Sequence, residues 1–305
     1  MYLNRVLEIQ DLLTGGNVKG QQVVDYFNSI YQSPPNTTTF YNQVSSDPTQ
    51  QSDVIFTQIN SNAPESGLMI VGQGSAIANQ GEYCIASDAD GIVCALVVAA
   101  ELLKMTGNGL NINKSITVST HIRYAANNME ISDELDLLIS QQQTTERVFD
   151  GILTVRAVKD NLRTNFRGFG IAPTVKEGWI LPMSSDLFRL AGETSGTSPQ
   201  MLPITMYDIT RGNNNPSLRV NNLLTPNVFT DKPVVGIGIS TQTKPPTWMR
   251  NSSHFAEIED TARFMVEAVL AYDSNDLALY DAGMFTRAKT RYSSIDMSTL
   301  QQITI

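Results

Sequence analysis

Three side chains of types that bind metal ions stand where apolar runs of the sequence end. Asp88 follows the run EYCIA, His121 follows SITVST, and His254 lies between PVVGIGIS and a long segment of helical periodicity. The two histidines are the only ones in the chain. Carboxylate oxygen and imidazole nitrogen together suit zinc, manganese or iron. The three residues therefore predict a site for one divalent ion, which would lower the pKa of bound water and polarise an amide carbonyl.

The same residues also have a structural interpretation. Asp88 or Asp90 can accept the first free backbone N–H groups of the helix that follows, and Gly91 lets the chain turn tightly there. Each histidine can be a hydrogen-bonded structural residue, and His254, which follows two serines, can belong to a helix-capping cluster. The sequence leaves the metal site and the capping interpretation open.

Two further charged residues are candidates for catalysis. Glu177 in the segment PTVKEG is a candidate general base, and Lys176 beside it is a candidate anchor for a substrate carboxylate. Their alternative is a turn whose charged side chains face water. Ser195 lacks the nucleophile-elbow pattern, and the glycines of VGQGSAIANQG match neither a dinucleotide nor a phosphate loop.

A sheet that gathers strand ends at one edge is needed to position these groups. Short apolar runs closed by Gly or polar residues alternate with helical segments, which predicts a three-layer α/β/α fold with a mixed, mostly parallel central sheet. We expect a single domain over 1–305, with a helical hairpin in 1–32 packed on it. Because ligands of open α/β sheets bind beyond the carboxyl ends of the strands, the polar residues at strand ends also include Gln73 after GLMIV, Arg156 after GILTV and Asp208 after PITMY.

Composition excludes several classes of partner. The net charge of -9 and the absence of a Lys/Arg cluster argue against nucleic acid and anionic membranes as partners. The N-terminal segment lacks the apolar core of a signal peptide and no run is long enough to span a membrane, so we expect a soluble, cytoplasmic protein. Cys84 and Cys94 are expected to be buried free thiols.

Several longer segments resemble a known family. The blocks VLEIQDLL, ASDADGIVCAL, ITVSTHI, GFGIAPTVKEGWIL, LPITMYDIT, PVVGIGIS and SSHFAEIEDTARFMVEA look like the bacterial family catalogued as domain of unknown function 1177, in order over nearly the whole chain. More distantly, the order of elements resembles the zinc aminopeptidases and carboxypeptidases that use a co-catalytic metal pair, a phosphorylase/hydrolase-like superfamily. This resemblance implies a zinc-exopeptidase-like fold, with Asp88 as the bridging carboxylate and His254 as the last ligand.

The sequence departs from that superfamily at three expected site positions. Gln73 stands where an early metal ligand is wanted, Thr120-His121 replaces a Glu-Glu pair, and Arg156 replaces a further carboxylate. A cation at the third position opposes a second metal electrostatically. The residues therefore support one zinc or other divalent ion at most, and the site can also lack metal altogether.

Two functions remain open at this stage, and with them the question of whether the chain is an enzyme. One is a metal-dependent hydrolase of small amide or peptide substrates with a reduced metal site. The other is a non-catalytic homologue that acts as a binding or self-assembling protein. Only 17% of the residues are charged, which weakens repulsion between copies and favours a homo-oligomer.

Overall fold

The computed structural model describes residues 2–14, 18–30, 35–44, 46–47, 51–74, 77–79, 83–85, 89–124, 133–158, 166–204, 209, 221–240 and 254–292. The helices are α1 (Tyr2–Thr14), α2 (Gly20–Ile30), α3 (Asp90–Gly107), α4 (Asp133–Thr145), α5 (Ser185–Ser195), the 3-10 helix η3 (Asn221–Val228), α6 (Phe255–Asp273) and α7 (Ala282–Tyr292). The strands are β1 (Thr37–Val44), β2 (Gln51–Ile59), β3 (Glu65–Gly72), β4 (Ile77–Asn79), β5 (Tyr83–Ile85), β6 (Lys114–Tyr124), β7 (Gly151–Ala157), β8 (Gly168–Ile171), β9 (Thr174–Lys176), β10 (Trp179–Leu181), β11 (Gln200–Met201) and β12 (Val234–Ser240).

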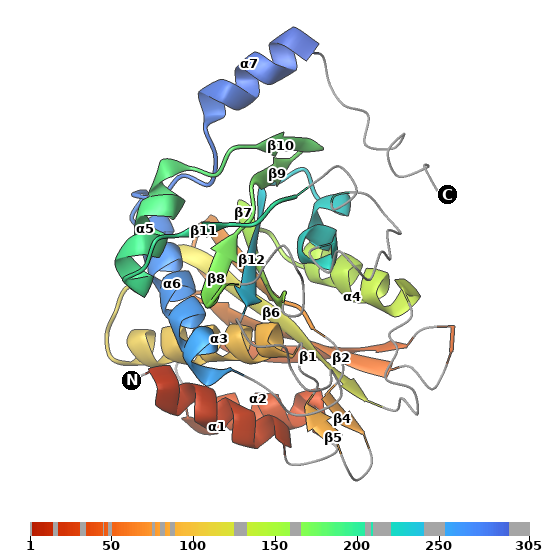
Figure 1. The fold of residues 1–305 in the computed structure, drawn as a ribbon. Helices are drawn as coiled ribbons and strands as arrows, with labels where there is room; N and C mark the ends of the chain where they lie inside the picture. The colour runs from red at the N-terminus through yellow and green to blue at the C-terminus, as the bar shows by residue number, and fades with distance from the viewer. Residues whose placement is uncertain are drawn as a thin grey trace.

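A 10-stranded mixed sheet runs through the centre of the structure (Figure 1). Its main path is β1-β2-β6-β3-β7-β12-β8-β11, and β9 and β10 form a hairpin attached to β12. The four strands β6-β3-β7-β12 in the middle are parallel, whereas β1, β2 and β8 join the sheet by antiparallel pairing. The predicted mixed sheet with a parallel centre is confirmed.

Helices cover both faces of this sheet. On one face α3 contacts α1 and α6, α1 also contacts α6, and α5 contacts α6, whereas α4 and η3 lie on the other face (Figure 1). Two separate apolar clusters correspond to the two faces: one is built around α3 and α6, and the other places Leu135 and Ile139 of α4 against Val54 and Val71 of the sheet. The predicted three-layer α/β/α architecture is confirmed.

The helix α3 is buried along most of its length. Every residue from Asp90 to Leu103 is buried, as expected for a helix that is apolar on all sides and lies between a sheet and other helices. At Gly91 the helix touches the sheet backbone: a Cβ atom there would lie 2.3 Å from the Gln73 carbonyl oxygen and 2.4 Å from that of Val155. Only glycine permits this approach.

One predicted strand lies elsewhere than expected. The run EYCIA was expected to lead from the central sheet into α3, but β5 pairs antiparallel with β4 in a separate two-stranded sheet. The reason lies in the central sheet, where β3 already has β6 on one side and β7 on the other. The residue that caps α3 is Ala89, which provides no side-chain cap, and Asp90 is already the first helical residue.

The N-terminal helices occupy the segments where helical periodicity predicts them. The helix α1 packs against α3 and α6, and α2 packs against β1 and β2. A buried contact of 3.3 Å between Arg5 Nε and Glu101 Oε1 links α1 to α3. Within the described parts of the chain, no helix combines the length and hydrophobicity needed to cross a membrane.

Replacement of Gly91 by Ala tests the close approach of α3 to the sheet. The new methyl group would meet three backbone atoms within 2.8 Å, and backbone cannot move aside as a flexible side chain can. We expect Gly91→Ala to lower the free energy of unfolding by about 3 kcal/mol, measured by urea denaturation. Gly107→Ala is the matched control, because it lies in the same helix and a Cβ atom there would meet nothing within 4 Å. The control is expected to be neutral or stabilising by up to about 1 kcal/mol; equal stabilities for both variants would contradict the packing argument.

Candidate functional site

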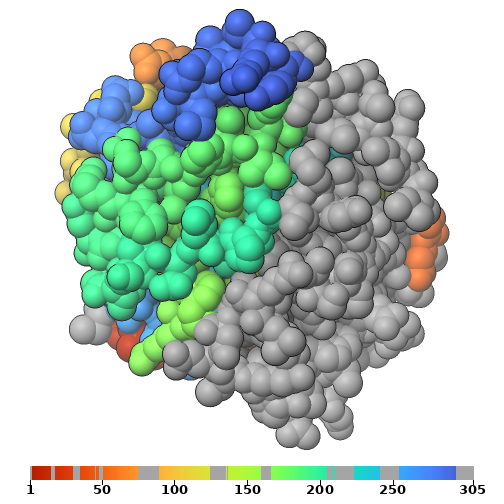
Figure 2. Space-filling view, turned by 45° about the horizontal axis from the view of Figure 1, so that its top comes forward, coloured from red at the N-terminus to blue at the C-terminus, as the bar shows by residue number. Residues whose placement is uncertain are grey.

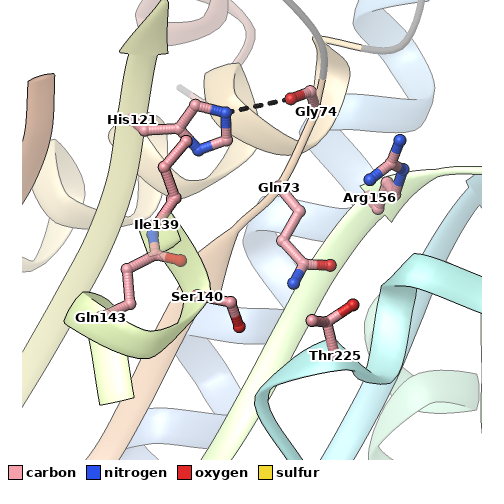
Figure 3. Close-up of a pocket in the computed structure, with 8 residues that line it drawn as sticks. All are labelled: Gln73, Gly74, His121, Ile139, Ser140, Gln143, Arg156 and Thr225. Carbon is pink, nitrogen blue, oxygen red and sulfur yellow. Dashed lines mark hydrogen bonds between the residues drawn. The ribbon is translucent and has the colours of Figure 1, made fainter. Parts of the chain in front are cut away.

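A pocket lies at the carboxyl edge of the parallel strands, between the sheet and α4. Its empty volume is about 280 Å³, part of which is continuous with solvent. Figure 3 shows the side chains around it. The sheet contributes Gln73, Gly74, His121 and Arg156, α4 contributes Ile139, Ser140 and Gln143, and η3 contributes Thr225.

Strand order and side-chain alternation place His121, Gln73 and Arg156 together. They belong to or directly follow the neighbouring strands β6, β3 and β7. His121 pairs with Val54, which packs against α4, so His121 faces the same layer. Gln73 lies two residues beyond Val71 and therefore shares that face. The backbone N–H of Gln73 donates to the Val155 carbonyl at 2.8 Å, which joins the ends of β3 and β7.

Arg156 reaches the same face of the sheet by the same alternation. Thr154, two residues earlier on β7, donates its hydroxyl to the Leu223 carbonyl of η3 at 2.5 Å. Arg156 is only partly buried, unlike the other polar residues that the strands contribute to the pocket. Its guanidinium group therefore brings positive charge to the more accessible part of the site.

The neighbouring residue Thr120 faces the opposite layer. Its hydroxyl donates to the Gly72 carbonyl at 3.2 Å, and a Cβ atom on Gly72 would lie 2.5 Å from Cβ of Ala95 in α3. The pair Thr120-His121 is thus divided between the two faces of the sheet. Only His121 contributes a side chain to the pocket.

The imidazole of His121 is held in one orientation. The side chain is buried, and its Nε2 lies 3.0 Å from the Gly74 carbonyl oxygen, a contact drawn in Figure 3. A carbonyl oxygen only accepts, so Nε2 carries the proton and donates. In the neutral ring the lone pair is then on Nδ1. Histidines that bind metal or act as bases are commonly oriented by a hydrogen bond of this kind through their other nitrogen.

Three polar atoms in the lining have no hydrogen-bond partner in the described structure. They are Gln73 Oε1, Ser140 Oγ and Gln143 Nε2. The residues are 7%, 2% and 1% exposed. A buried polar group without a partner costs about 1 to 3 kcal/mol, so we expect a polar ligand or ordered water to bond to these three atoms.

The predicted ligand set of Asp88, His121 and His254 stays a prediction, because Asp88 lies outside the described residues. His254 is the N-cap residue of α6, where its side chain makes no capping hydrogen bond and its backbone carbonyl accepts from Ile258 at 3.1 Å. It does not line the pocket with His121. No group of three His, Cys, Asp or Glu side chains suited to hold a metal ion is found in the part of the chain that the structure describes.

Glu177 and Lys176 lie at the other end of the parallel strands. The hairpin that carries them is attached to the first residue of β12 through the pair Val234 and Val175. Glu177 occupies a two-residue turn at φ 49°, and its carboxylate contacts Lys176 at 3.2 Å and Lys289 of α7 at 2.5 Å. The hydrogen bond from Lys289 holds the pKa of Glu177 below its usual range. Their catalytic roles stay a prediction, and these contacts favour the attachment of α7, which lies at the surface beside this hairpin (Figure 2).

Sequence reasoning missed the side of the pocket that α4 provides. A signal for it exists in the spacing of the helix, because Leu135, Ile139 and Gln143 recur every four residues. The first two residues of this stripe are apolar, whereas the third, Gln143, is polar and only 1% exposed. A polar residue on the buried stripe of a helix marks a place where the sheet opposite is polar as well.

Comparison with known proteins identifies the family and the fold. The chain belongs to the family described as "Protein of unknown function (DUF1177)", whose model matches residues 47–303. The resemblance stated from the sequence is thereby confirmed. No curated protein matches the sequence.

Solved structures of similar fold include aminopeptidases and glutaminyl cyclases. The aminopeptidase LapA of Legionella pneumophila has a TM-score of 0.54 and 10% identity, covering 90% of this chain and 71% of that chain. The glutaminyl cyclase of Porphyromonas gingivalis has 0.52 and 12%, covering 91% and 99%. The leucyl aminopeptidase of Trypanosoma cruzi, in its apo form, has 0.58 and 9%, covering 87% and 62%. At these identities the likeness establishes the zinc-exopeptidase-like fold alone.

Replacement of Glu177 by Gln tests its structural role. Because the pKa of Glu177 is lowered in the folded protein, its ion pairs stabilise α7 above about pH 4.5 and this contribution is lost as the pH falls through the lowered pKa. At pH 7 we expect Glu177→Gln to weaken the attachment of α7 by about 0.5 to 1 kcal/mol, measured as faster amide hydrogen exchange in α7.

The control for this variant is Glu193→Gln. Glu193 pairs with Arg189 at 3.0 Å on the surface of α5, away from α7. This variant is expected to leave exchange in α7 unchanged. The difference between the wild type and Glu177→Gln should shrink as the pH falls through the lowered pKa of Glu177, and a difference that does not depend on pH would show that the carboxylate charge is not the cause.

Proposed function

We propose that the chain is a hydrolase of small amide or peptide substrates and that it binds them in the pocket at the carboxyl edge of the sheet. The observation that carries this proposal is the arrangement of His121. Its Nε2–H donates to the Gly74 carbonyl at 3.0 Å, which orients the ring so that Nδ1 can act as a metal ligand or as a base. The pocket lies where open α/β sheets bind ligands.

A single divalent ion fits this site better than a metal pair. The described lining offers one imidazole, two amides and two hydroxyls, together with the guanidinium of Arg156, which disfavours a second cation nearby. We propose that His121 binds one ion, zinc or another divalent metal, and that Asp88 and His254 complete the ligand set. When bound, such an ion activates water and polarises the substrate carbonyl.

The chain's own residues supply the binding of the substrate. Gln73, Ser140 and Gln143 present buried groups able to accept from and donate to an amide. Ile139 provides an apolar wall beside them. A substrate seated against these groups displaces water and holds its amide next to His121.

We also propose that copies of the chain associate as a homo-oligomer in the cytoplasm. The low charged fraction of 17% and the exposed Met201 on the strand β11, which ends the main path of the sheet, support association. Sedimentation velocity is expected to show a species larger than 33.5 kDa. A single 33.5 kDa species at high concentration would contradict association.

His121→Gln tests the proposed hydrolase. Glutamine keeps an N–H able to reach the Gly74 carbonyl but lacks the imidazole lone pair. For protein purified without a histidine tag, we expect about one divalent ion per chain and hydrolysis of a panel of dipeptides and N-acyl amino acids, followed by mass spectrometry. The variant is expected to lose activity roughly 100-fold.

The matched control is Thr117→Val. Thr117 is buried on the same strand and four residues before His121, but it does not line the pocket. It is expected to retain the wild-type rate, with both variants checked for folding by circular dichroism. Full activity of His121→Gln, or absence of hydrolysis across the panel with metal supplied, would overturn the proposed reaction.

A further inference from the structure

We infer that the pocket selects amides that carry a free carboxylate next to the amide, as in an N-acyl amino acid or the last residue of a short peptide. This inference rests on the proposed function and names its substrate class. It is based on two parts of the lining: a set of buried polar side chains that binds the amide, and Arg156, which binds the carboxylate.

The buried part matches both sides of an amide group. Gln143 Nε2 and the Ser140 hydroxyl can donate to an amide oxygen, and Gln73 Oε1 can accept from an amide N–H. Figure 3 shows the side chain of Gln73 directed toward Ser140 and Thr225. Because no described residue bonds to these three buried atoms, a ligand amide could take the place of ordered water as their partner.

The carboxylate of the ligand would lie at the outer end of the pocket, because Arg156 is more exposed than the residues that would bind the amide. Gln143 and Ser140 are at most 2% exposed, whereas Arg156 is only partly buried. A guanidinium group binds a carboxylate with short, charge-assisted and often bidentate hydrogen bonds. The chain carries a net charge of -9, so binding of an anion at this edge depends on a local cation such as Arg156.

The size of the pocket limits the ligand to a small molecule. Its empty volume of about 280 Å³ includes space open to solvent, so the enclosed part is small. The enclosed part admits a single amide group, and the acyl group and amino-acid residue of such a ligand would extend into the open part. Ile139 offers apolar contact for the acyl group or the side chain.

The test is a binding experiment that does not require turnover. Protein treated with chelator is titrated by calorimetry with N-acetyl-L-alanine and with N-acetyl-L-alaninamide, in which a neutral carboxamide replaces the carboxylate. We expect the acid to bind roughly tenfold more tightly than the amide. Arg156→Gln should abolish this preference and leave the affinity for the amide within about twofold, whereas Arg156→Lys should keep part of it.

Two further variants separate the parts of the site. Gln143→Leu should weaken both probes to a similar degree, because it removes a donor to the amide that they share. Arg189→Gln, which changes an exposed arginine of α5, should change neither affinity. Equal binding of the two probes, no binding of either, or a preference that survives Arg156→Gln would overturn the inference.

The outcomes distinguish this inference from the proposed hydrolysis. Carboxylate-dependent binding without any turnover in metal-loaded protein would uphold the recognition and refute the reaction. Turnover of amides without preference for the carboxylate would uphold the reaction and refute the recognition.

Discussion

The contact between α3 and the ends of β3 and β7 fixes the geometry on which the site depends. Gly91 brings the helix against the carbonyl oxygens of Gln73 and Val155 and the Cα atom of Arg156. Two of these residues line the pocket on the other face of the sheet. Dense packing resists displacement. The buried helix α3 therefore fixes the backbone of Gln73 and Arg156, although it does not contact the functional groups of these two side chains.

The alternation of side chains along each strand directs neighbouring residues to opposite faces of the sheet, where they have different roles. On β6, Thr120 faces α3 and bonds to the backbone of β3, while His121 faces α4 and the pocket. A shift of one residue in register would exchange them. The apolar clusters on both faces, which include Ile122 on one side and Val54 on the other, hold the register that keeps the imidazole on the α4 side.

The sequence predicts the parts of this structure that depend on local pattern. Hydrophobic periodicity and turn residues predict α3, α6 and the parallel strands. Because His121, Gln73 and Arg156 stand at the ends of apolar runs, the sequence also predicts that they lie at one edge of the sheet. The sequence misplaces the strand before α3, because strand pairing depends on which sheet edges are already occupied. Ser140 and Gln143 are missed for a related reason, since only tertiary packing decides which turn of α4 meets the strand ends.

The polar atoms of the pocket are the observation on which the proposed ligand depends. Each buried group without a partner costs about 1 to 3 kcal/mol, a large share of the stability of an ordinary domain. Apolar side chains at Ser140 and Gln143 would fill the same space against Ile139 without that cost. The recognition that we propose would account for hydroxyl and amide groups at these positions, because a bound ligand would supply hydrogen bonds to them. In that proposal the guanidinium of Arg156 selects ligands that carry a carboxylate, and His121 belongs to the same lining.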